Sequence, residues 1–200
     1  MRRFAICALA LLLLLPGAPA QGQVRMALSA GINLSTLDFD NPWTWHGGAL
    51  GVAFGLPVSD RWSLELASNL SGKGYWEEYD GECPPGPYPC ALGGGVSLIY
   101  LEFMALADRR IDLAGPVRLH LRAGHFAGYQ DSRENTKAFD HGVALGSQVE
   151  VGPSGTWGFL AGALYAHGLV NTGPIRVGPY APYQKTRTLT LRIGVSRLIG

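Results

Sequence analysis

Charged side chains that could carry acid–base or ion chemistry occupy alternate positions of several apolar segments. They are Glu65, Lys73, Glu102, Arg118, His120, Arg122, Glu150 and Arg192. Such groups inside one enclosed space could form a proton or ion path, or they could pair with one another. Because an unpaired buried charge is costly, we favour a paired structural network. Folding the chain about the connection at 108–116 predicts that Glu102 faces Arg122. Pairing of the two strands that follow predicts that Glu150 faces Arg118 or His120.

Three histidines, His125, His141 and His167, occupy the positions between those of the charged residues. In an extended segment they therefore lie on the opposite face. Histidine can activate a serine nucleophile, bind a metal or lie at a membrane interface. No serine of that face stands two residues from any of the three. We therefore predict no catalytic residue, no metal and no cofactor, and we expect interfacial side chains. The predicted membrane-interface set is Trp62, Trp76, Tyr129, His141, Trp157 and His167.

Two further groups lie in connecting segments. Cys83 and Cys90 flank a proline-rich stretch, and a disulfide is the expected state in an exported chain. Acidic residues at 38–40 and 77–82 could bind calcium, but a solvated loop surface is the simpler interpretation.

The segments that carry these side chains show an apolar period of two residues. Apolar and small or polar residues alternate over eight segments, 24–35, 47–58, 62–75, 95–107, 117–129, 140–151, 157–170 and 186–198. Strands of globular proteins are usually about 5–6 residues long, whereas a strand that crosses a membrane needs about 9–11. Segments of this length and pattern indicate membrane-crossing strands.

Composition decides which face meets lipid. The chain has 28 glycines among 200 residues, and charged residues are only 16%. Small residues suit the interior of an eight-stranded barrel and would make a poor solvated exterior, which argues against a soluble lipocalin-like barrel. A net charge of +1 argues against nucleic acid as a partner. We predict an all-β fold, an eight-stranded antiparallel up-and-down transmembrane β-barrel.

Connection lengths and the N-terminus supply the orientation. The connections alternate long and short, as in outer-membrane barrels with external loops and short periplasmic turns. Arg2 and Arg3, an apolar run and small residues before position 20 resemble a secretory signal peptide. We predict a signal peptide at 1–20 and a barrel domain at 21–200, with the long loops external and both termini periplasmic.

Several segments resemble bacterial outer-membrane β-barrel proteins of the PorT-like and OmpA-like eight-stranded type. They are Ala30-Gly31-Ile32-Asn33-Leu34-Ser35, the stretch from Glu65 to Gly74, Tyr100-Leu101-Glu102, Phe139-Asp140-His141-Gly142, Tyr165 with Gly168-Leu169, and Lys185-Thr186-Arg187. The resemblance implies the outer membrane of a Gram-negative-type bacterium, with its lipid and its assembly machinery as partners.

Function is less restricted than fold, because members of this family differ in activity. We expect a non-enzymatic protein with a structural or surface-binding role, carried by loops at 36–46, 76–94, 130–139 and 171–185. An extracellular ligand or a periplasmic partner would be unidentified. The alternatives are a lipid A-modifying outer-membrane enzyme and a narrow pore for small solutes.

Overall fold

The computed structural model describes residues 23–36, 45–77, 94–131, 138–152, 156–169 and 186–199. They form eight strands. These are β1 (Val24–Thr36), β2 (Trp45–Pro57), β3 (Trp62–Glu77), β4 (Gly94–Asp112), β5 (Val117–Asp131), β6 (Ala138–Val151), β7 (Trp157–Gly168) and β8 (Arg187–Ile199). Each overlaps one predicted segment. No helix in this part of the chain is long and apolar enough to span a bilayer.

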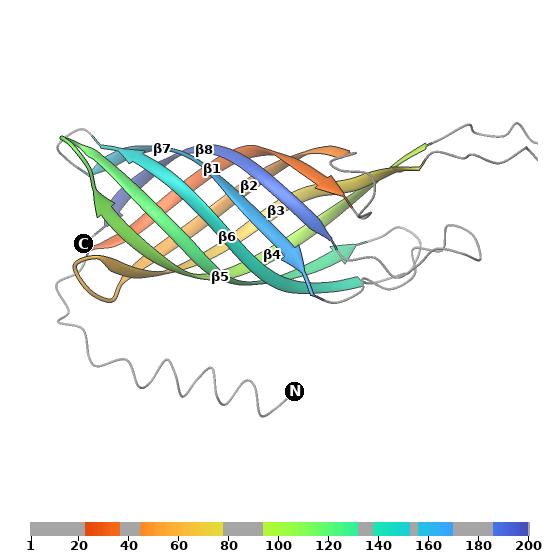
Figure 1. Ribbon diagram of the computed structural model, residues 1–200, viewed down its shortest axis with the longest axis horizontal. Coiled ribbons are helices and arrows are strands. Elements are labelled where there is room, and N and C mark those ends of the chain that lie inside the picture. The colour runs from red at the N-terminus through yellow and green to blue at the C-terminus, as the bar shows by residue number, and fades with distance from the viewer. Residues whose placement is uncertain are drawn as a thin grey trace, which may run out of the picture.

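The strands close into an antiparallel barrel in sequence order (Figure 1). Each strand pairs with its neighbours along the chain, and β1 pairs with β8 from Val24 opposite Ile199 to Thr36 opposite Arg187. Closure leaves no unpaired sheet edge, which a strand-built membrane protein requires. The predicted fold class is confirmed.

Side chains alternate between the two faces of the wall as the pattern predicts. Large apolar side chains lie on the outside, and Ile193 and Phe159 are 69% and 66% exposed. Most of the buried polar and charged side chains lie on the inside. An apolar exterior over all eight strands would be unfavourable in water and is favourable in hydrocarbon.

The two ends of the barrel differ in their connections. Segments 58–61, 113–116 and 152–156 join strands at one end, called here the turn end. There the amide of Leu113 donates to the carbonyl of Val117, and Gly115 adopts a φ of 63° that favours glycine. The strand ends that flank the four longer connections lie at the opposite end, called here the loop end.

Candidate functional site

A buried ion-pair cluster fills the turn end of the interior, with Arg25 of β1 at its centre. Nη2 of Arg25 lies 3.0 Å from Oε2 of Glu65 and 3.0 Å from Oδ2 of Asp108. Nη1 lies 3.7 Å from Oε2 of Glu150. One guanidinium therefore joins carboxylates from β3, β4 and β6 across the lumen.

His120 lies between two of those carboxylates. Its Nδ1 is 2.9 Å from Oδ2 of Asp108, and its Nε2 is 3.1 Å from Oε2 of Glu150. The hydroxyl of Ser196 also donates to Glu150. The hydroxyl and the imidazole supply the hydrogen bonds that make burial of these carboxylates tolerable.

Arg122 and Arg118 extend the cluster in opposite directions. Nη1 of Arg122 contacts Oε1 of Glu65 at 3.1 Å, deep in the interior. Nη1 of Arg118 lies 3.9 Å from Oε2 of Glu150, but this side chain is 42% exposed at the mouth of the barrel. Arg192 of β8 is also buried, with 9% of its surface exposed.

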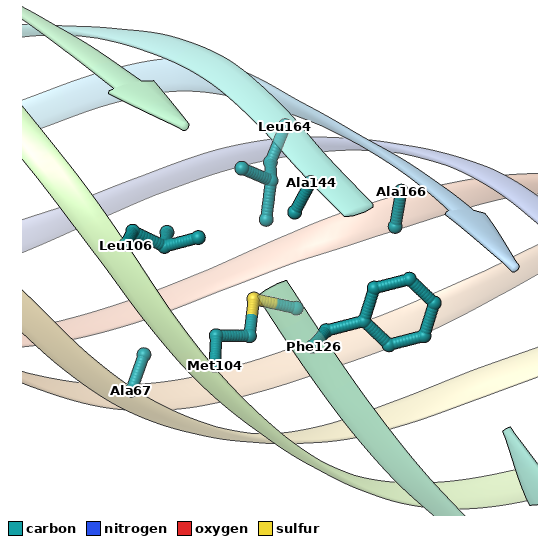
Figure 2. Packing of buried hydrophobic residues seen from close by; sticks show 7 residues of the cluster. All are labelled: Ala67, Met104, Leu106, Phe126, Ala144, Leu164 and Ala166. Atoms are coloured by element: carbon teal, nitrogen blue, oxygen red, sulfur yellow. The ribbon is translucent and has the colours of Figure 1, made fainter. Parts of the chain in front are cut away.

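An apolar layer crosses the middle of the interior (Figure 2). Its members are Ala67, Met104, Leu106, Phe126, Ala144, Leu164 and Ala166. On β4, Met104 and Leu106 stand between the buried charges of Glu102 and Asp108. The layer therefore separates the turn-end cluster from the polar side chains nearer the loop end.

A second polar group lies on the loop-end side of this layer. Nζ of Lys73 is 2.5 Å from Oε1 of Glu102, and it also lies 4.8 Å from the ring centroid of Tyr100 and 5.4 Å from that of Phe126. Thr186 donates to the buried carboxylate of Asp140. Lys73 neutralises the charge of Glu102, and Thr186 gives the carboxylate of Asp140 a hydrogen bond. Neither lipid nor the apolar layer could provide these contacts.

The predicted pairing of Glu102 with Arg122 is wrong. Glu102 faces Gly128 and binds Lys73, whereas Arg122 faces Asp108. The reason is the length of β4, which extends to Asp112, so that only 113–116 form the turn. The observed turn is shorter than the predicted connection at 108–116, and its centre lies nearer to β5. The residue of β5 opposite Glu102 is therefore Gly128, six positions beyond the predicted Arg122.

The predicted contact of Glu150 is present with both candidates. Arg118 is its register partner, and His120 donates a hydrogen bond to it. Arg25, Asp108 and Asp140 are members of the network that the sequence did not predict. Arg25 and Asp140 already stood on the inward face of the alternation, but Asp108 was assigned to a connection.

Two tryptophans lie on the outside of the barrel at the turn end. Trp62 and Trp157 are both exposed. The guanidinium of a cross-strand arginine stacks on each, Arg109 at 5.7 Å and Arg197 at 5.3 Å from the ring centroid. Such pairs suit an interface, where rings contact acyl chains and guanidiniums contact head groups. At the loop end Tyr129 is exposed, and Trp76 lies in β3 but its side chain is outside the described residues.

The three histidines surround Val143 on the outer wall near the loop end. His125 and His167 are the register partners of Val143 on either side, and His141 precedes it by two residues. The rings of His125 and His141 are 6.4 Å apart. Nδ1 of His125 donates to the carbonyl of Gly142 at 2.5 Å, and Nδ1 of His167 lies 3.4 Å from the hydroxyl of Tyr165.

Other predicted features are not reached by the structure. The signal peptide and the pair Cys83–Cys90 lie outside the described residues. Within the described ranges, no group of three or more histidine, cysteine or acidic residues has a metal-binding arrangement.

Among solved structures, this chain is similar to Neisserial surface protein A (NspA), with 14% identity and a TM-score of 0.52. The match covers 87% of this chain and 96% of NspA. Ail, the attachment invasion locus protein of Yersinia pestis, is 15% identical over 88% of this chain and 98% of its own, with a TM-score of 0.46. A major outer membrane protein from Thermus thermophilus is 14% identical over 89% and 100%, with a TM-score of 0.46. At these identities the likeness to NspA shows the fold alone.

No family model matches the chain, and no curated protein matches it.

Proposed function

We propose that this chain is a non-enzymatic outer-membrane β-barrel protein, with a structural or surface-binding role carried by the segments that connect its strands at the loop end. The observation that carries the proposal is the combination of a lipid-compatible wall with a filled interior. The wall explains residence in a membrane, and the interior leaves the loops as the part able to meet other molecules. We also propose that the chain is a barrel of the PorT-like or OmpA-like type.

The interior argues against a pore. Arg25, Glu65 and Asp108 occupy the turn end, and Leu106, Leu164 and Phe126 form a buried apolar layer above them. An eight-stranded barrel is just wide enough for its own side chains, and an apolar constriction excludes hydrated ions. We expect no steady single-channel steps in planar bilayers, and such steps would overturn the filled-interior part of the proposal.

Spacing on the outer wall argues against Ser68 and His125 as the nucleophile and base of a lipid A-modifying enzyme. Ser68 is the outward serine on the row next to that of His125, but β4 lies between their strands. Two strand spacings of about 4.8 Å exceed the reach of a hydrogen bond between a nucleophile and its base. A lipid A deacylation assay on the purified protein decides the point, and activity lost in His141→Ala would establish the enzyme instead.

Fractionation with gel analysis tests compartment and fold together. The protein should sediment with outer membranes, and its unheated form should migrate differently from the boiled form, because the barrel resists detergent until heated. Recovery in the soluble periplasmic fraction would overturn the proposal. Binding by the loops can then be sought with whole cells, comparing the native chain with one whose 78–93 connection is shortened.

A further inference from the structure

The outer wall carries a groove of about 600 Å³ that the proposed function does not use. It runs across β2 to β6, and its lining includes Phe54, Leu66, Phe103, Ala105, Ala127 and His141. Its exposed lining is almost wholly apolar. Behind it lie Ala67, Met104 and Phe126 of the interior apolar layer, so no buried charge stands beneath the groove.

The groove follows the register of the sheet. One row runs from Phe54 through Leu66 and Ala105 to His125, and the next runs from Val52 through Ser68, Phe103 and Ala127 to His141. From β2 to β6 this is four strand spacings, or about 19 Å. That length is comparable to an extended fatty acyl chain. The small side chains of Ala105 and Ala127 leave the hollow between bulkier neighbours.

His141 stands at the loop-end extremity of the groove as the cross-strand partner of Ala127. His125 lies beside it, one outward position along β5 on the turn-end side of Ala127. The two imidazoles make this the polar end of the groove, and Tyr129 and Phe139 follow towards the loop end. Because Nδ1 of His125 donates to the carbonyl of Gly142, its Nε2 is the nitrogen left to meet a ligand. That nitrogen accepts from a lipid hydroxyl in the neutral ring and donates to a phosphate in the imidazolium. Apart from Ser68, the rest of the groove offers apolar contact.

We propose that the groove binds one phosphorylated, multiply acylated lipid of the loop-side leaflet, the chemistry of lipid A, with an acyl chain along β2–β6 and a phosphate at His125 and His141. The wall faces hydrocarbon, so the occupant of an apolar groove on it is a lipid. The polar end of the groove lies towards the loop end, which sets the direction of the bound molecule. This inference rests on the proposed outer-membrane orientation, in which the loop-side leaflet contains lipid A.

Native mass spectrometry of the purified protein with defined lipids tests the acyl-chain contact. Ala127→Leu and Ala105→Leu fill the groove, and each should reduce retained lipid A about tenfold, or about 1.4 kcal/mol. Ala161→Leu is the matched control, because this outward alanine of β7 lies outside the groove. Equal retention in the groove variants and in Ala161→Leu would overturn the inference. Heat-modifiable migration verifies that each variant is folded.

The head-group contact has its own test. His141→Ala should lower the preference for bisphosphorylated over dephosphorylated lipid A about tenfold, and His167→Ala, on the same wall outside the groove, should leave it unchanged. Retention of phosphatidylglycerol or phosphatidylcholine as strong as that of lipid A would overturn the assignment. Because mass spectrometry uses isolated protein, this result is independent of fractionation, so failure of one proposal is distinguishable from failure of the other.

Discussion

Arg25 shows how one residue can organise the interior of this barrel. Its guanidinium contacts Glu65, Asp108 and Glu150, which come from three strands and are all buried. Removing it would leave three carboxylates close together with less compensation. Removing one partner of a buried ionic group commonly costs about 3–5 kcal/mol, far more than an exposed pair contributes.

The first prediction is that Arg25→Met lowers the free energy of unfolding by about 3–5 kcal/mol, measured by urea titration in lipid vesicles with tryptophan fluorescence. Arg118→Met is the matched control, because Arg118 is 42% exposed and makes a long contact with Glu150. It should cost at most about 1 kcal/mol. Similar losses in the two variants would contradict the central position of Arg25.

The second prediction concerns Lys73 and Glu102. Glu102→Gln should lower the melting temperature, because the amide cannot neutralise the ammonium group 2.5 Å away. In a double-mutant cycle, the free energy of unfolding lost in the Lys73→Met, Glu102→Leu double variant should be smaller than the sum of the losses in the two single variants. The expected difference is about 1–3 kcal/mol. Additive effects, or unchanged melting of Glu102→Gln, would show that the pair does not interact.

Strands in this barrel approach one another closely where small residues face inward. A Cβ atom at Gly124 of β5 would lie 2.1 Å from the carbonyl oxygen of Ala105 on β4. Gly48 of β2, by contrast, has open space where its Cβ would be. The β4–β5 contact therefore depends on the absence of a side chain at Gly124.

The third prediction is that Gly124→Ala destabilises the barrel by about 1–3 kcal/mol through overpacking. Gly48→Ala should change stability by no more than about 0.5 kcal/mol. The measurement is again urea unfolding in vesicles, with circular dichroism to verify strand content. A neutral Gly124→Ala would mean that β4 and β5 can separate without cost.

At the scale of the whole molecule, the fourth prediction concerns the contact between the outer wall and the bilayer. Ile193 lies at the middle of β8 and Ile199 at its turn-end terminus, and both are exposed. Ile193→Arg should cost about 2–4 kcal/mol, as for a cation at the bilayer midplane, and Ile199→Arg about 0–1 kcal/mol, as near the interface. Unfolding free energies in vesicles measure both, and equal costs would contradict a depth-dependent lipid contact.

Local physics made much of the fold predictable from the sequence. Alternation of Leu189, Leu191 and Ile193 with Thr190 and Arg192 assigns both the strand and its lipid face, because successive side chains of a strand point to opposite sides. The ends of the strands are harder to predict, because aspartates such as Asp108 and Asp112 are common in turns. They continue β4 because pairing with Arg122 and Arg118 extends the ladder.

The eight strands and their inward and outward faces follow from the sequence alone, because each depends on neighbouring residues and on the solvent they meet. The pairing of the charges and the position of the hollow in the outer wall follow only from the folded barrel. Arg25 is 83 residues from Asp108 and 95 from His120 along the chain, and closure of the barrel brings them together across the lumen. Such contacts depend on the register of every intervening strand, and a shift at one turn exchanges the partners.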